Sequence, residues 1–381
     1  MRKIVRQLAI LFSCLLAFNN SIAQNGNCMS LRAEDFQKTI NGKQVDLFFL
    51  KNGQIEAAIT NYGGRIVGLC APSKNGEMAD VILGFKSIDD YLKATGVYHG
   101  AIIGRVAGRI ANGSFNLNGS SYSLQLNNPP NHLHGGINGF HNQVWDVSAA
   151  TDTSIVLTYL SVDGEMGYPG NLNVKATYIL NSKNEFSMEL TATTDKSTPV
   201  NLTNHAFFNL AGEGSGTILN MELTIPAKYI CSVDADKIPT GKLMRVKSTP
   251  FDFRKAKPIG KDLILEKTDE QMKFVSGYDH HFVLSKKKSS VMKLAAIVLD
   301  KQSGCKLEVF TNEPCIHFFS ANFFKGNDIG KKGKPINFRE SFALETQRFP
   351  VAPNQETFPS IILHPGEKYE SKTILRFSLV K

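Results

Sequence analysis

The sequence lacks the features that mark zinc-binding, nucleotide-binding and membrane-spanning proteins. Its six cysteines include no pair with CxxC spacing, which argues against a zinc ribbon, and they are too few for a disulfide scaffold. There is no HExxH motif and no Walker-type phosphate loop, and Gly104 and Gly108 lack the long helix that follows in a dinucleotide site. No apolar run reaches the ~20 residues that span a bilayer.

The first 23 residues carry the pattern of a cleaved secretory signal. A basic start at residues 2–6 precedes a short apolar run at residues 8–18, and residues 21–23 supply the small side chains that a signal peptidase reads. The run is too short for a membrane anchor. A lipoprotein signal at Cys14 fits less well because a bulky phenylalanine stands two residues before it. We therefore expect export to the periplasm or the medium, and no membrane association after cleavage.

Cleavage would leave a mildly basic chain without a concentrated basic surface. It would remove three positive charges and no acidic residue, so the formal charge would fall from +9 to +6. The lysine runs at residues 286–288 and 331–334 flank expected strands and indicate solvated loop tips, so we expect no nucleic-acid partner. Five cysteines would remain, an odd number that cannot all pair, and the sequence does not say which do.

Alternation of apolar and polar residues predicts β-strands along most of the chain. It is clearest at residues 172–180 and 186–192, where every second residue is apolar, as in strands with one buried face. Asn-Gly pairs at 41–42, 52–53 and 118–119 separate strand-like segments and predict tight hairpins. Hairpins of this kind build antiparallel sheets.

Helical signals are scarce by comparison. One or two helical turns are expected after Ser87, which is a good N-cap residue, and another at residues 261–265. The sequence therefore predicts an all-β protein with a leader at residues 24–35. One large antiparallel β-sandwich domain is expected to occupy residues 36–381.

Five polar residues from separate segments stand in apolar, glycine-rich or aromatic surroundings: Arg109, His134, His205, Asp279 and Glu345. Each alone has an ordinary structural explanation, because buried polar groups are commonly satisfied by hydrogen bonds. Together they suit a polyhydroxylated ligand, since sugars need charged hydrogen-bonding groups beside apolar surfaces. His132 and His134 have a spacing at which an extended strand holds a metal, but the two prolines just before them favour a loop.

The chain resembles the aldose 1-epimerase, or galactose mutarotase, family from about residue 36 to residue 377. Its most specific motifs are Asn-Leu-Thr-Asn-His at 201–205 and Leu-Glu-Thr-Gln at 344–347, in this order. Further matching segments are residues 80–85, 104–110, 132–136, 277–282 and 349–350. The resemblance implies a large β-sandwich with a sugar cleft on one sheet, a free aldose as substrate, no cofactor and no metal. We also expect a monomer.

The resemblance implies that His205 is the general acid and Glu345 the general base of an anomer interconversion. Opening a cyclic hemiacetal takes the proton from the anomeric hydroxyl and gives one to the ring oxygen, and each such transfer typically contributes about 10²–10⁴-fold. Rotation of the aldehyde and reclosure then yield the other anomer. The residues expected to bind the sugar are Arg109, His134, Asp279, His317 and Phe207.

Three places depart from the family pattern. Gly108 stands where an asparagine is frequent, Ala206 and Phe207 stand where Ser-Tyr is frequent, and His317 stands where a glutamine is usual. These changes alter hydrogen bonds to sugar hydroxyls and leave the acid and the base in place. The sequence therefore does not choose between glucose, galactose or another aldose.

Two other functions stay open at this point. The changed pocket residues are compatible with a catalytically silent carbohydrate-binding protein of the same fold, although both His205 and Glu345 are retained. A glycoside hydrolase would use Asp279 and Glu345 as paired carboxylates, which that chemistry requires at a defined separation.

Overall fold

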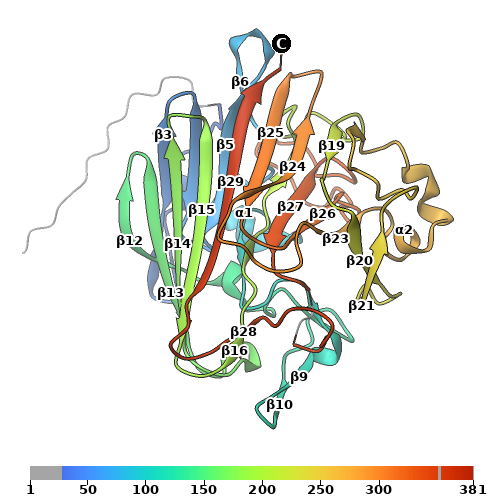
Figure 1. Ribbon diagram of the computed structural model, residues 1–381. Coiled ribbons are helices and arrows are strands. Elements are labelled where there is room, and N and C mark those ends of the chain that lie inside the picture. The colour runs from blue at the N-terminus through green and yellow to red at the C-terminus, as the bar shows by residue number, and fades with distance from the viewer. Residues whose placement is uncertain (1–27, 351–352, 381) are drawn as a thin grey trace, which may run out of the picture.

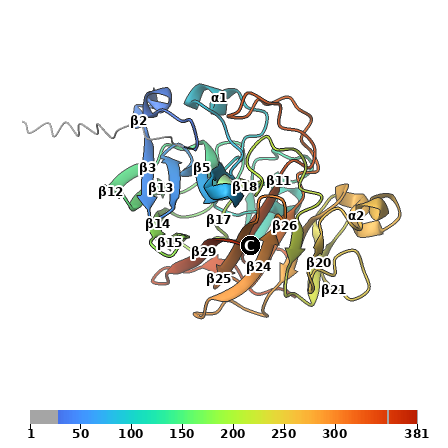
Figure 2. The same ribbon diagram turned by 90° about the horizontal axis from the view of Figure 1, so that it is seen from above.

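The computed structural model describes residues 28–350 and 353–380. The secretory signal expected at residues 1–23, and the first part of the expected leader, lie outside the described residues. The described chain is almost entirely β, as the sequence predicts. Two short α-helices, α1 (Ile88–Lys93) and α2 (Glu270–Val275), lie at its periphery (Figures 1 and 2).

Three antiparallel sheets account for most of the strands. In spatial order, the nine-stranded sheet consists of β12 (Asp146–Thr151), β13 (Ser154–Ser161), β14 (Leu172–Asn181), β15 (Glu185–Thr194), β29 (Tyr369–Leu379), β25 (Cys305–Thr311), β24 (Lys293–Leu299), β19 (Glu222–Thr224) and β22 (Lys257–Pro258). The six-stranded sheet consists of β18 (Phe207–Phe208), β27 (Phe342–Gln347), β26 (Cys315–Phe319), β23 (Asp279–Val283), β20 (Tyr229–Val233) and β21 (Pro239–Arg245). The four-stranded sheet consists of β3 (Leu47–Asn52), β4 (Ile55–Thr60), β5 (Arg65–Pro72) and β6 (Met78–Asp80).

Short elements complete the described chain. The two-stranded pairs are β1 (Lys38–Ile40) with β2 (Lys43–Val45), β9 (Ser114–Leu117) with β10 (Ser120–Ser123), β8 (Arg109–Ile110) with β11 (His132–Leu133), β7 (Ile102–Ile103) with β17 (Thr203–Asn204), and β16 (Thr198–Pro199) with β28 (Ile362–Leu363). The 3-10 turns are Ala33–Phe36, Lys74–Gly76, Ala111–Gly113, Phe140–Asn142, Glu165–Gly167 and Leu263–Lys267.

The sheets pack face to face as a sandwich. The nine-stranded sheet runs across the front of Figure 1, with the four-stranded sheet behind its β12–β15 half and the six-stranded sheet behind its β24–β25 half (Figures 1 and 2). One hydrophobic core joins all three, because Ile59 of β4, Tyr178 of β14 and Phe318 of β26 belong to the same buried cluster. The predicted antiparallel β-sandwich is confirmed.

The sequence patterns act locally as expected. In β14 every second residue from Leu172 to Leu180 is buried, which matches the period of a strand with one core face. The hairpin turns at Asn41 and Asn118, each followed by glycine, have the positive φ angles that favour Asn-Gly there. Ser87 caps α1 by accepting a hydrogen bond from the backbone N–H of Asp90. The helix expected at residues 261–265 is a 3-10 turn, and α2, which follows it, was not predicted.

The described part of the leader packs against β5. Met29 and Leu31 are buried, and Cys28 forms a disulfide with Cys70 of β5. Gly68 makes room for this contact, because a Cβ atom there would lie 2.5 Å from the Met29 sulfur. The other described cysteines are free and buried: Cys231, Cys305 and Cys315.

The first residue of one lysine run is not solvated as the sequence indicates. Lys331 is only 3% exposed, and its Nζ lies 2.6 Å from Asp80 Oδ2 while donating to the carbonyls of Val67 and Ile82. The prediction is correct for Lys332 and Lys334, which are exposed, and wrong for Lys331, because a lysine run in the sequence does not show that a buried carboxylate faces its first member. None of the helices in the described ranges is long and apolar enough to cross a membrane.

Candidate active site

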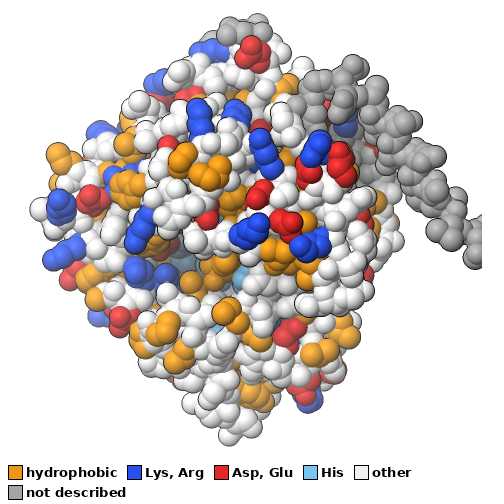
Figure 3. Space-filling model, turned by 180° about the vertical axis from the view of Figure 1, so that it is seen from behind, with side chains coloured by type: hydrophobic (Ala, Val, Ile, Leu, Met, Phe, Trp, Pro, Cys, Tyr) orange, Lys and Arg blue, Asp and Glu red, His pale blue; other side chains and the backbone are white. Residues whose placement is uncertain are grey.

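A cavity of about 190 Å³ lies on the face of the six-stranded sheet that points away from the core. Its size suits a ligand smaller than the drug-sized molecules that fill 300–1,000 Å³ pockets. All seven site residues expected from the sequence line it: Arg109, His134, His205, Phe207, Asp279, His317 and Glu345. In the view from behind, histidine side chains show near the middle of the surface between hydrophobic and basic ones (Figure 3).

Strand geometry brings two of these residues, His317 and Glu345, into one row with His281. Successive side chains of a strand point to opposite faces of the sheet. His280 of β23 therefore faces the core, where its ring lies 4.6 Å from that of Phe251, while His281 faces the cavity. His281 lies directly opposite His317 of β26, which lies directly opposite Glu345 of β27. Side chains paired in this way lie within contact distance.

The proposed acid and base lie together at the floor of the cavity. His205 Nε2 is 3.5 Å from Glu345 Oε1, and the two residues are 6% and 2% exposed. The backbone holds His205 in place, since its N–H donates to Ala101 O at 2.8 Å and its carbonyl accepts from Gly100 N at 3.0 Å. Among the described residues, no group hydrogen-bonds to His205 Nδ1 or to Glu345 Oε2. Leaving such buried atoms unpaired costs about 1–3 kcal/mol each, and both residues line the cavity, so these two atoms point to a function in ligand binding or catalysis.

Aromatic rings frame this pair. The Tyr98 ring is stacked on His205 with 5.8 Å between centroids and 19° between planes, and the Phe207 ring lies 4.7 Å from His205. His134 meets His205 edge to face at 5.3 Å. Burial holds the pKa of His134 well below its usual value, so this ring is neutral near pH 7. Its Nδ1 accepts from the Gly108 N–H at 3.2 Å, which leaves Nε2–H as a donor for a ligand.

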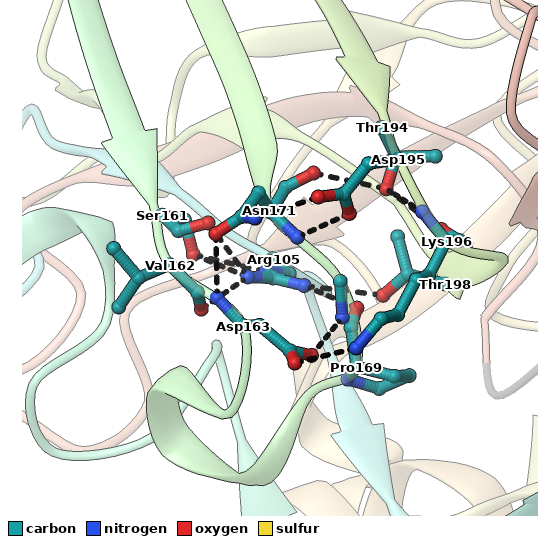
Figure 4. Close-up of polar contacts among 11 residues, drawn as sticks. Arg105, Ser161, Val162, Asp163, Pro169, Asn171, Thr194, Asp195, Lys196 and Thr198 are labelled. Atoms are coloured by element: carbon teal, nitrogen blue, oxygen red, sulfur yellow. Dashed lines mark hydrogen bonds and ion pairs between the residues drawn. The ribbon is translucent and has the colours of Figure 1, made fainter.

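Two arginines of one glycine-rich stretch have different environments. Arg109 of β8 lines the cavity, and only its Nε has a hydrogen-bond acceptor among the described residues, Asn128 Oδ1 at 3.1 Å. Arg105 lies outside the cavity and is 2% exposed. Its guanidinium donates to the following acceptors: Ser161 Oγ and O, Val162 O, Pro169 O and Thr198 Oγ1 (Figure 4). Arg105 is thus satisfied by the protein, whereas Arg109 has donors to spare.

The carboxylate of Asp279 is held by a histidine. His317 Nε2 lies 2.7 Å from Asp279 Oδ1, and His317 Nδ1 lies 3.1 Å from His281 Nδ1. Burial alone would raise the pKa of Asp279, but the hydrogen bond and positive charge of His317 outweigh it and hold that pKa well below its usual value. Burial would likewise lower the pKa of His317, and Asp279 outweighs it, so the pKa of His317 is raised. The two side chains form an ion pair at the cavity wall.

Sequence reasoning missed some residues of the cavity. His281 and Gln347 line it, each two residues after a predicted site residue, so the period of a strand places them on the same face. Tyr98 follows α1 in a loop, and no sequence pattern pointed to it. His132 does not face a metal, because its ring nitrogens lie 2.7 Å from Gln125 O and 2.9 Å from the Tyr168 hydroxyl. Among the described residues, no group of three or more His, Cys, Asp or Glu side chains is placed to hold a metal ion.

Comparison with known proteins gives consistent results. The family model described as aldose 1-epimerase matches residues 46–376. The chain is 40% identical to galactose mutarotase of Rattus norvegicus over 338 residues, which cover 89% of this chain and 95% of that protein. It is 35% identical to aldose 1-epimerase of Escherichia coli K12 over 340 residues, which cover 88% and 96%.

Solved structures agree with the fold. The aldose epimerase homologue from C. elegans superposes with a TM-score of 0.79 at 31% identity, covering 88% of this chain and all of that one. Galactose 1-epimerase from Lactobacillus acidophilus superposes with a TM-score of 0.77 at 29% identity, covering 90% and 97%.

Proposed function

The chain belongs to the aldose 1-epimerase family, and we propose that it interconverts the α and β anomers of free aldoses by opening and reclosing the sugar ring. The observation that carries the mechanism is the buried pair of His205 and Glu345, 3.5 Å apart, each with one polar atom that no described residue satisfies. The anomeric hydroxyl and the ring oxygen of a pyranose are bonded to the same carbon. An acid and a base that serve both oxygens at once must therefore lie side by side, as these two do.

Ring opening needs one proton removed and one proton added. Glu345 takes the proton of the anomeric hydroxyl while His205 gives a proton to the ring oxygen, and the bond between the anomeric carbon and the ring oxygen breaks. The aldehyde then turns about its bond to the next carbon. On reclosure His205 takes back the proton from the attacking hydroxyl and Glu345 returns one to the carbonyl oxygen, so both residues recover their starting states.

The remaining wall residues orient the sugar in this proposal. The guanidinium donors of Arg109 that have no protein acceptor and the Nε2–H of His134 would donate to sugar oxygens, and the second oxygen of Asp279 would accept from a sugar hydroxyl. The ring of Phe207 offers an apolar surface to the sugar's C–H groups. His317 belongs to the same wall through its bond to Asp279.

We also propose that the protein is exported. The sequence pattern of residues 1–23 motivates this, and the disulfide between Cys28 and Cys70 supports it, because such bonds persist mainly in oxidising compartments. Sequencing the N-terminus of the protein recovered from the periplasm or medium tests it. A start at Gln24 is expected, and recovery of the intact Met1 form from the cytoplasm alone would contradict the proposal.

The test of the proposed activity is polarimetry of freshly dissolved α-D-glucose and α-D-galactose. The protein should speed the drift of rotation above a no-enzyme blank and reach the same final value as the blank. A rate equal to the blank across a panel of free aldoses, with sugar binding retained, would instead indicate a binding protein. New reducing ends from a panel of glycosides would indicate a hydrolase. Asp279 already holds His317, which argues against its use as a hydrolase acid.

A further inference from the structure

Both ring nitrogens of His317 face protein partners rather than open space. One lies 2.7 Å from Asp279 Oδ1 and the other 3.1 Å from His281 Nδ1. We propose that His317 and His281 are positioning residues that act on the sugar through Asp279, without donating to the sugar themselves. The inference rests on the proposed sugar site, and it changes the role expected for His317 from direct contact to support.

The arrangement follows from strand register. Asp279 and His281 are two residues apart on β23, so both point into the cavity. His317 of β26 lies directly opposite His281 and diagonally next to Asp279, since Asp279 pairs with Phe319. One imidazole can therefore reach both neighbours at once, and the ring centroids of the two histidines lie 4.3 Å apart.

The hydrogen-bonded row of Asp279, His317 and His281 can hold its protons in two ways. The Asp279 carboxylate only accepts, so His317 Nε2 must carry a proton. If His317 is an imidazolium, its Nδ1–H donates to His281, which is neutral with its proton on Nε2. If His317 is neutral, His281 donates from Nδ1 instead. The raised pKa of His317 and the pKa of His281, which burial holds well below its usual value, favour the first state near neutral pH.

Neither state leaves His317 an N–H for the sugar. The other charged and titratable groups that face His317 are Glu345 from β27, Arg109 from β8 and His134 after β11. What the sugar would meet is the second oxygen of Asp279, because the bond to His317 occupies Oδ1. His317 neutralises this carboxylate and fixes its rotation, so the free oxygen is presented as an acceptor without an isolated buried charge.

A double-mutant cycle separates support from direct contact. The variants are His317→Gln, Asp279→Asn and the two combined, and the readouts are KM and kcat for α-D-galactose and α-D-glucose together with Kd by calorimetry. We expect Asp279→Asn to raise KM about 10–100-fold and His317→Gln about 3–10-fold, with kcat changed much less than KM. Added to Asp279→Asn, the His317→Gln change should shift KM or Kd less than twofold, because the group through which it acts is gone.

The cycle has outcomes that overturn the inference. If the effects of the two changes on KM multiply in the double variant, His317 contacts the sugar itself. If KM is unchanged in His317→Gln alone, the bond of His317 to Asp279 does not affect sugar binding. His364→Gln is the matched control, since His364 is exposed and outside the cavity, and it should change neither constant. If the wild type binds sugar but shows no turnover, and the Kd values of the variants show the expected coupling, the proposed function fails and the inference about His317 and His281 stands.

Histidine NMR gives a second readout that needs no variant to fold. In the sugar-free wild type, the nitrogen-15 spectrum should show His317 doubly protonated below neutral pH and His281 protonated only on Nε2. Adding a saturating aldose should leave both assignments unchanged. A shift of the His317 proton resonances on binding as large as that of the His134 Nε2–H would contradict the inference.

Discussion

Arg105 and Arg109 stand four residues apart, yet one belongs to a satisfied polar cluster and the other to an unsatisfied one. Around Arg105, the guanidinium donates to five protein oxygens, and no atom of this side chain is left without a partner (Figure 4). Around Arg109, His205 Nδ1 and Glu345 Oε2 are buried without hydrogen bonds from described residues. Both regions bury polar groups, so burial alone does not distinguish a site from a structural cluster. What distinguishes the second region is that its unpaired polar atoms belong to residues that line one cavity.

The largest expected effect is on the rate of anomer exchange, and it comes from a residue of the cluster around Arg109. Glu345→Gln should slow anomer exchange by about 10²–10⁴-fold, because the amide cannot take the proton of the anomeric hydroxyl. Its free energy of unfolding should stay the same or rise, since a buried carboxylate with an unpaired oxygen is replaced by a neutral group. Rate constants from polarimetry and urea unfolding of the same preparation check both. A wild-type rate in Glu345→Gln would show that Glu345 is not the base.

In the cluster around Arg105, a substitution should lower stability and leave the activity unchanged. Arg105→Met should lower the free energy of unfolding by about 3–5 kcal/mol, because it strips hydrogen bonds from buried carbonyl and hydroxyl oxygens. Chemical denaturation measures this, and kcat per folded molecule should remain near wild type. A large fall in kcat with unchanged stability would place Arg105 in the site.

Arg109→Met is the matched partner of that variant. Losing the unpaired guanidinium donors should raise KM by about 10–100-fold, since hydrogen bonds to charged groups contribute about 1.5–3 kcal/mol. The free energy of unfolding should change by less than about 1 kcal/mol, because only Asn128 loses a partner. If Arg109→Met instead unfolds the protein as much as Arg105→Met does, the distinction between the two arginines fails.

The smallest expected effect is a pH-dependent stability difference between wild type and His317→Gln. The pKa of Asp279 is lower in the folded protein than its unfolded value of 3.8, so its ionised form stabilises the fold above pH 3.8, and this stabilisation is lost as the pH falls towards the folded pKa. The pKa of His317 is higher in the folded protein than its unfolded value of 6.5, so its protonated form stabilises the fold below pH 6.5, and this stabilisation is lost as the pH rises through the folded pKa. The difference should therefore peak at about 1–2 kcal/mol between pH 3.8 and 6.5 and shrink at alkaline pH. A difference that grows above pH 8 would contradict this ion pair.

Much of the fold was predictable because its signals are local. The alternation at residues 172–180 needs only neighbouring residues to place a strand, and the turns at Asn41 and Asn118 need only two. Five of the seven site residues stood out in the sequence as polar groups in apolar, glycine-rich or aromatic segments, and the family resemblance implied their roles. The cavity brings all seven together. The buried ion pair of Lys331 with Asp80 was not predictable, because nothing in a lysine run announces a partner on a distant strand.

The roles within the site also lay beyond local sequence. Arg105 and Arg109 share one glycine-rich stretch, and only the packing of the chain tells which is satisfied by the protein. The bond between His317 and Asp279 depends on the register of β23 against β26, and a shift of one residue would turn His317 towards the core. Register of this kind is set by the whole sheet.

The roles assigned to Glu345 and Arg105 can be tested together on one set of samples. Saturation transfer between the α and β anomeric protons of equilibrated glucose or galactose gives the exchange rate, and thermal unfolding of the same samples gives stability. We expect Glu345→Gln to slow the enzyme-dependent exchange by about 10²–10⁴-fold and to keep or raise the melting temperature. We expect Arg105→Met to lower the melting temperature and to keep the exchange rate of the folded fraction. Exchange that persists in Glu345→Gln at the wild-type rate would contradict the role of Glu345 as the base.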